Sequence, residues 1–386
     1  MKPATTVIHG VRTVDRDAAP LTTPIYETTT FLFESAQEVL DYNEGRSPKY
    51  LYSRYSNPTI AAVEHTLAAL EGAERALVMS SGQGATSTAL LSLLQAGDEL
   101  VCSAAIYGGT FHLIADMLSK FGIRARFVST EELRQPDTIL SPATKLLWFE
   151  SPINPTLRCV DIAKIASACR AKGVISVIDN TFASPINQQP LSLGVDLVMH
   201  SATKYLNGHS DVTAGVLAGS GAHMETILKG RKLFGAILDP YPAYALGRGL
   251  KTLSVRVARH NANAMAVAQW LDRCGRVERV YYPGLASHPD HAIAKKQMSG
   301  FGGMVCVDVG GGYERAARFF DRLKVFRRAA SLGGVESLCS LPVLTSQWGH
   351  SDAELDAAGI TRSMARLSVG LEDHEDLIAD LDQALA

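Results

Sequence analysis

The amino-acid sequence predicts an α/β fold built on a mostly parallel sheet, followed by a smaller C-terminal α/β domain. Short apolar runs, such as 76–79, 99–102 and 145–150, alternate with stretches of helical length and amphipathic spacing. This alternation is typical of a parallel sheet that helices cover on both faces. Of the 386 residues, 46% are hydrophobic and 20% are charged, which is enough apolar material for a compact core. A chain of this length should form two or three domains.

Charge and cysteine content exclude several classes of function. The 37 basic and 39 acidic residues leave a formal charge of −2, so we expect no nucleic-acid or anionic-membrane partner. No stretch approaches the roughly 18 apolar residues of a spanning helix, and the N-terminus lacks a secretory apolar core. The six cysteines show no metal-binding or disulfide spacing, which indicates free thiols, no metal and a cytoplasmic protein.

Residues 1–50 are predicted to be an N-terminal arm. The segment holds four prolines and weak periodicity, and only 35–42 has the pattern of a short helix. Its apolar segment 31–33 must be buried against other protein, and a neighbouring subunit is the simplest partner. We therefore expect a homo-oligomer.

Residues 51–247 carry the repeated strand and helix signals of the large domain. A helix over 60–71 should end at Gly72, and a strand over 76–79 leads through a glycine turn into a helix over 85–94. The backbone N–H groups of Gly82 and Gln83 at that helix start are expected to form an anion site, although the loop matches neither a Walker A motif nor a dinucleotide-binding motif. Further strands are expected at 99–102, 125–129, 145–150, 174–179 and 196–199, with helices at 107–121 and 161–172. Functional side chains should gather where these strands end.

Residues 248–386 are predicted to form the smaller domain. Pro240, Pro242 and Gly247 break the pattern before a long helix over 252–274, so we place the domain boundary at about 247.

Lys204 is the candidate at the centre of the chemistry. It follows the apolar run 196–199, and a partly desolvated lysine has a lowered pKa, so its neutral amine can attack an aldehyde. A lone lysine in such a place is usually only exposed. Here, however, the hydroxyls of Ser201 and Thr203 can reach a phosphate on the same small molecule. Asp179, at the end of a β-branched run, can keep a pyridine nitrogen protonated, and the set indicates pyridoxal 5'-phosphate as cofactor.

The stretches Asp179-Asn-Thr-Phe and Ser201-Ala-Thr-Lys-Tyr-Leu-Asn-Gly-His-Ser-Asp resemble the signature of the Cys/Met-metabolism pyridoxal phosphate enzymes. That family includes cystathionine γ-synthase, cystathionine γ- and β-lyases, methionine γ-lyase and O-acylhomoserine sulfhydrylases. The resemblance runs through nearly the whole chain. It implies the type I, aspartate-aminotransferase-like fold and a homotetramer of dimers that share active sites.

The resemblance also implies roles for residues around the cofactor. Gly82 and Gln83 match the phosphate cup, and Tyr52 and Arg54 match a motif that holds the phosphate of the partner subunit's cofactor. Tyr107 would stack on the pyridine ring and take part in proton transfer. With Lys204 and Asp179, it makes up the expected catalytic set.

Substrate residues follow from the same resemblance. Asn154 would lie near the cofactor and substrate, while Ser331 and Arg366 would contact the substrate carboxylate, Arg366 through a bidentate fork. Glu336 matches a glutamate that meets the distal amino group of cystathionine. Gly109 stands where methionine γ-lyases have cysteine.

We therefore expect a cystathionine γ-lyase or γ-synthase acting on an amino-acid substrate by γ-elimination or γ-replacement. Methionine γ-lyase and O-acylhomoserine sulfhydrylase are the alternatives, because the stretch 344–351 departs from the Thr-His-Ala-Ser of many members and leaves the distal pocket open. An aminotransferase would use the same lysine and aspartate. A non-catalytic cofactor-binding protein would leave Tyr107, Arg366 and Tyr52 without a role.

Overall fold

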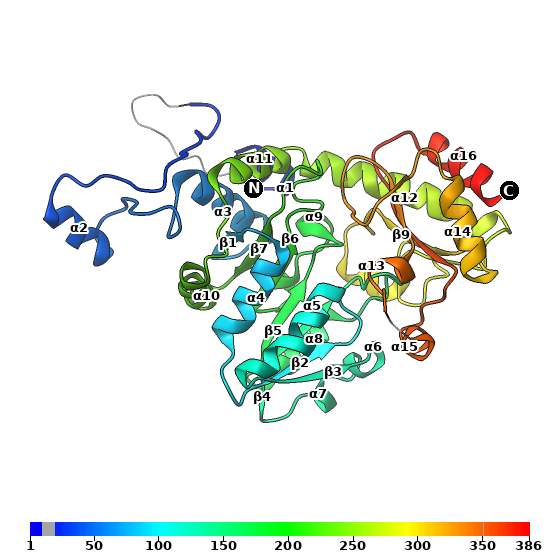
Figure 1. Ribbon diagram of the computed structural model, residues 1–386, viewed down its shortest axis with the longest axis horizontal. Helices are drawn as coiled ribbons and strands as arrows, with labels where there is room; N and C mark the ends of the chain where they lie inside the picture. The colour runs from blue at the N-terminus through cyan, green and yellow to red at the C-terminus, as the bar shows by residue number, and fades with distance from the viewer. Residues whose placement is uncertain (10–19, 350) are drawn as a thin grey trace.

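The computed structural model describes residues 1–9, 20–349 and 351–386, and within them it contains two β-sheets (Figure 1). The first sheet has the strand order β1-β7-β6-β5-β4-β2-β3. All neighbouring pairs from β6 to β3 are parallel, whereas β7 runs antiparallel to both β1 and β6. The mostly parallel sheet predicted from the sequence is confirmed. Its strands are β1 (Arg75–Met79), β2 (Glu99–Ser103), β3 (Arg124–Val128), β4 (Thr144–Glu150), β5 (Ile175–Asp179), β6 (Leu197–Ser201) and β7 (Gly215–Gly219).

Helices cover both faces of this sheet. Alternate residues of each strand enter different cores, so that Trp148 and Val177 pack on the side of α4 while Leu147 and Ile178 pack on the side of α8. This two-sided burial explains why the strands other than β3 are mostly apolar. The helices of this part are α3 (Pro58–Glu71), α4 (Gly82–Leu93), α5 (Gly108–His112), α6 (Thr130–Leu133), α7 (Pro136–Ile139), α8 (Ile162–Ala171), α9 (Ser184–Asn187) and α10 (Gly221–Phe234).

Strand β7 was not predicted, and glycines at both of its ends explain why. A Cβ at Gly215 would lie 2.1 Å from the Ser81 carbonyl oxygen, so glycine is required where the start of α4 packs on the strand. The predicted helix over 107–121 is also less regular than expected. After α5 the chain continues as a π-helical turn (Leu113–Met117) and a 3-10 turn (Leu118–Phe121).

The second sheet has the order β10-β11-β12-β9-β8, and every neighbouring pair except β10 with β11 is antiparallel. Its strands are β8 (Arg279–Tyr281), β9 (Met304–Asp308), β10 (Arg327–Arg328), β11 (Leu338–Ser340) and β12 (Met364–Ser368). The long helix α12 (Leu253–Arg273), predicted at 252–274, packs on it together with α14 (Gly312–Arg322) and α16 (His374–Leu385). The shorter helices α13 (His291–Gln297) and α15 (Asp352–Ala357) complete this part.

The stretch predicted to break the pattern near residue 240 is helical, and that expectation was wrong. Helix α11 (Pro240–Leu250) starts with Pro240 in its first turn, where a proline loses no hydrogen bond because the first N–H groups of a helix have no intrahelical partner. Gly249 fits because a Cβ there would lie 2.3 Å from the Asn207 carbonyl oxygen. The prolines therefore begin a helix that packs behind the Lys204 loop.

The N-terminal segment extends from the body of the molecule, where α2 (Ala36–Asn43) stands apart in Figure 1. Leu32 is 93% exposed, and Ile25 and Leu40 are also exposed. In contrast, α1 (Pro3–His9), which was not predicted, buries Val7 against α3. Part of the predicted arm, 10–19, lies outside the described residues.

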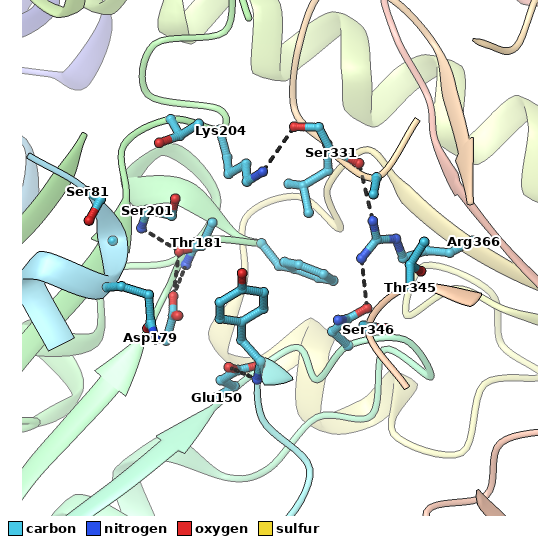
Figure 2. A pocket seen from close by; sticks show the side chains of 18 of the residues that line it. Ser81, Glu150, Asp179, Thr181, Ser201, Lys204, Ser331, Thr345, Ser346 and Arg366 are labelled. Carbon is cyan, nitrogen blue, oxygen red and sulfur yellow. Dashed lines mark hydrogen bonds between the residues drawn. The ribbon is translucent and has the colours of Figure 1, made fainter. Parts of the chain in front are cut away.

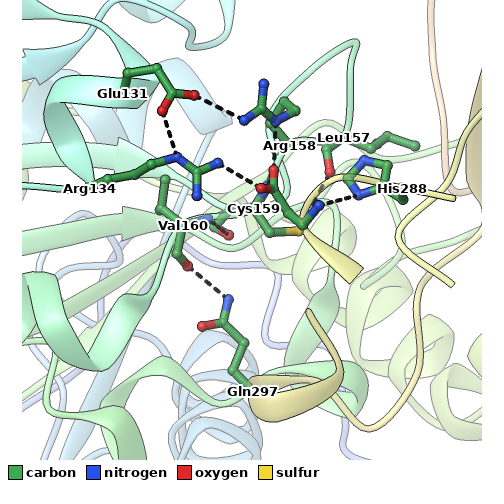
Figure 3. Close-up of polar contacts among 10 residues, drawn as sticks. Glu131, Arg134, Leu157, Arg158, Cys159, Val160, His288 and Gln297 are labelled. Carbon is green, nitrogen blue, oxygen red and sulfur yellow. Dashed lines mark hydrogen bonds and ion pairs between the residues drawn. The ribbon is translucent and has the colours of Figure 1, made fainter. Parts of the chain in front are cut away.

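Polar contacts around Arg134, Arg158 and Cys159 tie the two halves of the chain together (Figure 3). Asp290 accepts hydrogen bonds from Arg134 Nη2 and Arg158 Nε, both at 2.6 Å, and from the Cys159 N–H at 2.9 Å. Burial alone would raise the pKa of Asp290, but the bonds from the two arginines outweigh it and hold that pKa below its ordinary value. The segment that follows Asn154 is thereby fixed to the loop before α13.

Among the described residues, no helix combines the length and the apolar composition needed to cross a bilayer.

Candidate active site

A cavity of about 590 Å³ opens at the carboxyl ends of β4, β5 and β6 and reaches the second sheet (Figure 2). Parallel strands of an open sheet present their ligand sites at this edge. Ten of the thirteen site residues predicted from the sequence line it. They are Gly82, Gln83, Tyr107, Asn154, Asp179, Ser201, Thr203, Lys204, Ser331 and Arg366.

Lys204 lies in the turn that follows β6, between the strand-end residues and the second sheet (Figure 2). Its Nζ donates to Ser331 Oγ at 3.0 Å, and no carboxylate pairs with it among the described residues. Burial, together with the positive charge of Arg366, lowers its pKa. The neutral amine that attack on an aldehyde requires is therefore more accessible here than in a solvated lysine.

Asp179 ends β5, and Thr181 holds its carboxylate. Asp179 Oδ1 accepts from both the Thr181 N–H, at 3.0 Å, and the Thr181 hydroxyl. The same hydroxyl oxygen accepts from the Ser201 N–H at 2.8 Å, which links the ends of β5 and β6. Thr181 was not among the site residues predicted from the sequence, although a threonine two residues after an aspartate is a common turn partner.

The start of α4 provides an anion-binding end to the cavity. Ser81 caps the helix by accepting from the Gly84 N–H at 2.9 Å, which leaves the N–H groups of Gly82 and Gln83 at the cavity wall. A Cβ at Gly82 would lie 3.2 Å from Ser201 Oγ, so glycine lets that hydroxyl approach the helix start. Ser201 was expected to reach a phosphate, and this position suits that role.

Thr203 is more restrained than expected. Its hydroxyl already donates to the Ala214 carbonyl at 3.2 Å and accepts from the Ala214 N–H at 3.0 Å. It lines the cavity, but a ligand oxygen would have to share it.

Tyr107 lines the cavity with its side chain 51% exposed, and its main chain is held by the end of β4. Its N–H donates to Glu150 Oε1 at 2.7 Å. Gly109 leaves room for the Tyr107 ring, because a Cβ there would lie 2.6 Å from it and the ring would have to shift. Glu150 was not among the site residues predicted from the sequence, where it stands only as the polar end of an apolar strand.

Arg366, on β12, is a buried guanidinium without a carboxylate partner among the described residues. Its Nη1 donates to Asn154 Oδ1 at 3.0 Å and its Nη2 to the Ser331 carbonyl at 3.2 Å, while Nε has no partner. An arginine has five N–H donors, so three remain for a ligand. Such an arrangement suits a planar anion, because leaving a buried charge unpaired is costly.

The three other predicted residues do not line this cavity. Arg54 donates to the Lys232 carbonyl, and its guanidinium lies 5.4 Å from the centre of the Tyr52 ring. Glu336 accepts a hydrogen bond from the Ser210 hydroxyl. In the stretch that departs from the family pattern, Leu344, Thr345 and Ser346 line the cavity, and His350 lies outside the described residues.

The residues present fit pyridoxal phosphate. The helix start with Ser201 can hold a phosphate, the exposed face of Tyr107 can stack on a flat ring, and Asp179 can pair with a ring nitrogen. Lys204 is the amine on the same cavity, and Arg366 lies where a second, smaller anion can bind. The cavity volume is within the usual range for a cofactor with an amino acid.

Comparison with known proteins agrees. The family model described as "Cys/Met metabolism PLP-dependent enzyme" matches residues 4–386. The chain is 43% identical to the L-methionine gamma-lyase of Pseudomonas putida over 98% of this chain and 95% of that protein. It is 42% identical to the chloroplastic cystathionine gamma-synthase 1 of Nicotiana tabacum over 95% of this chain and 68% of that protein. The crystal structure of metB from Corynebacterium glutamicum, 40% identical, superposes with a TM-score of 0.93 over 100% of this chain and 98% of that one.

Proposed function

Since the chain belongs to the Cys/Met metabolism PLP-dependent enzymes, we propose that it acts at the γ-carbon of an amino acid, as a cystathionine γ-lyase or γ-synthase. The family makes it a pyridoxal phosphate enzyme of sulfur amino-acid metabolism, and the likeness to metB confirms the predicted fold class. Relatives of almost equal sequence identity are named for different activities, so identity does not distinguish between those activities and the residues of the site must do so.

One observation carries the proposal: a half-buried amine and a buried, carboxylate-free guanidinium share one cavity. Lys204 and Arg366 both contact Ser331, the amine through its hydroxyl and the guanidinium through its carbonyl. A substrate with an amino and a carboxylate group on one carbon can reach both. That chemistry is an α-amino acid.

When bound, pyridoxal phosphate supplies the electron sink for negative charge at the substrate Cα. Lys204 is then the base that removes the Cα proton, and burial with the nearby charge of Arg366 lowers its pKa, which favours the neutral amine that this role requires. The Ser331 hydroxyl orients that amine. Asp179, held by Thr181, would retain a proton on the ring nitrogen, and Tyr107 would cover the ring and take part in proton transfer.

Arg366 fixes the substrate carboxylate, with Asn154 holding one side of the guanidinium in place. Fixing the carboxylate orients the Cα–H bond toward Lys204. Binding then pays part of the entropic cost of reaching the transition state in advance, which lowers the barrier. Action at the γ-carbon also needs a proton to leave Cβ. Lys204 is the residue proposed for both proton transfers. No carboxylate among the described residues pairs with its Nζ, so the amine is free to accept a proton from either carbon.

Gly109 supports the cystathionine enzymes over methionine γ-lyase. A larger residue there would require the Tyr107 ring to move, since the Cβ position lies 2.6 Å from it. Methionine γ-lyase and O-acylhomoserine sulfhydrylase remain the alternatives, the first because of the 43% identity to the Pseudomonas putida enzyme. Glu336 is proposed to select for the distal amino group of cystathionine.

We further propose a cytoplasmic homotetramer of two site-sharing dimers. The exposed apolar arm residues Leu32 and Leu40 support association. Arg54 and Tyr52 lie away from the cavity of their own chain, which supports a role at the neighbouring site. The domain division is proposed at residues 1–50, 51–247 and 248–386.

A substrate panel tests the proposed function. Cystathionine, methionine, homocysteine, cysteine and O-acylhomoserines with and without cysteine should be compared for release of keto acid, ammonia or cystathionine. Turnover should be highest when cystathionine is the substrate or the product. Faster turnover of methionine, or of an O-acylhomoserine with sulfide, would replace the proposal with the corresponding alternative. Stoichiometric conversion of a keto acid would instead indicate an aminotransferase.

A further inference from the structure

Two carboxyl groups lie side by side under the cofactor ring subsite, and the chemistry above uses only one of them. Glu150 and Asp179 end β4 and β5, and they are register partners in these neighbouring parallel strands. Adjacent strands are about 4.8 Å apart. Both side chains leave the sheet on the face that carries Trp148 and Val177. The register therefore places the two acids within one strand spacing.

Their surroundings are unequal. Glu150 is 5% exposed, accepts one N–H from Tyr107 and forms no ion pair among the described residues. Asp179 is less deeply buried and accepts two hydrogen bonds from Thr181. Hydrogen bonds to an ionised carboxylate favour the charged form, so Asp179 is the member better able to carry charge.

We propose that Glu150 is a neutral carboxylic acid in the working enzyme and a positioning residue. It leaves the single negative charge of the pair on Asp179 and fixes Tyr107 through its main-chain N–H. This inference rests on the family cofactor and does not depend on which sulfur amino acid is the substrate.

The neighbouring charges agree with this division. Burial raises the pKa of Glu150 well above its ordinary value, and the charge of Asp179 acts in the same direction. Burial also raises the pKa of Asp179, but the Thr181 hydrogen bonds and His200 on β6 oppose the rise. The other titratable group facing Glu150 is Cys102 on β2, a buried thiol with a raised pKa. None of these groups offers Glu150 a cation.

A neutral Glu150 keeps the charges at the ring balanced. One aspartate would then be available to pair with one protonated ring nitrogen. A second carboxylate at the same edge would raise the proton affinity of every group there.

Infrared difference spectroscopy of the holoenzyme tests the protonation state. The wild type should show the C=O stretch of a buried protonated carboxyl at neutral pH, and Glu150→Gln should lack it. Asp290→Asn is the matched control, because Asp290 is also buried but is ionised by two arginines. It should retain the band. A wild type without the band, or a band that survives in Glu150→Gln, overturns the proposal.

Two further readouts test the positioning role. The pH midpoint of the visible cofactor absorption should be the same in Glu150→Gln as in the wild type, because one neutral group replaces another. Loss of an anion would instead lower that midpoint. Glutamine also keeps an oxygen for the Tyr107 N–H, and Glu150→Leu does not. The leucine variant should bind pyridoxal phosphate about 5- to 150-fold more weakly than the glutamine variant, because a buried donor is left unpaired. Equal affinities, or a shifted midpoint in Glu150→Gln, contradict the positioning role; if the leucine variant does not fold, the infrared and titration comparisons decide.

Discussion

Replacing Arg366 by lysine tests the substrate end of the site most sharply. Lysine keeps a positive charge but loses the planar fork, so it can make one of the two hydrogen bonds that a guanidinium offers to a carboxylate. A hydrogen bond to a charged group contributes about 1.5–3 kcal/mol. The expected loss of kcat/KM is therefore about 10- to 150-fold for Arg366→Lys, from one lost bond. Arg366→Ala, which loses both, should cost about 10²- to 10⁴-fold.

The assay compares each α-amino acid substrate with its carboxamide. The effect of Arg366→Lys should be largest for the carboxylate and small for the carboxamide, because the charge that the guanidinium pairs with is then absent. The difference between the two losses is the interaction energy of the pair. Equal losses on both compounds would refute the reasoning and assign Arg366 to holding the Ser331 loop.

Arg231 offers a matched control. It is equally buried and also has an unpartnered Nε, but its guanidinium is paired with Glu64 and lies outside the cavity. Arg231→Lys should lower the melting temperature and change kcat/KM by less than about threefold, within the range of substitutions remote from a site. A large kinetic effect in this control would mean that any disturbed buried arginine mimics loss of substrate binding.

Four other outcomes are expected. Borohydride reduction of the holoenzyme should attach the cofactor to Lys204, and Lys204→Ala should lose the visible band of the bound cofactor; a label on another lysine contradicts the assignment. Mixing inactive Arg54→Ala and Lys204→Ala chains should recover activity, because one site of a mixed dimer has both groups, and no recovery after verified subunit exchange places them in one chain. Asp290→Asn should lower the free energy of unfolding near neutral pH by about 2–3 kcal/mol, because two partly exposed arginines lose a buried partner. The pKa of Asp290 is lower in the folded than in the unfolded protein, so the extra stability of the wild type should be complete above the unfolded pKa and disappear as pH falls through the folded pKa. A stability difference in urea titrations that does not change with pH would argue against an ionic contribution. Glu336→Gln should reduce kcat/KM about 10- to 150-fold for cystathionine and little for homocysteine, and equal losses would assign Glu336 to supporting the loop through Ser210.

Much of the cofactor end could be predicted from sequence because its residues are local to strand ends. Asp179, Ser201 and Lys204 each follow an apolar run, and the carboxyl ends of neighbouring parallel strands necessarily meet at one edge. Once the strands are located, the register of the sheet brings these side chains together. Six of the seven strands of that sheet were predicted. All of these except β3, which buries only Val128, are largely buried, and two-sided burial leaves a clear apolar signature.

Only the tertiary structure decided the contacts between distant segments. Asn154 and Arg366 are 212 residues apart in the chain and 3.0 Å apart in space, and no sequence spacing expresses that distance. Glu336 lies outside the cavity and accepts a hydrogen bond from Ser210, and Pro240 is compatible with α11 because it falls in the first turn. Glu150 is the clearest case: its significance comes from register with Asp179 and from burial without a cation. Both are properties of packed neighbours, so the sequence by itself determined which polar groups follow the strands, and the fold decided which of them meet at the cavity and how deeply each is buried.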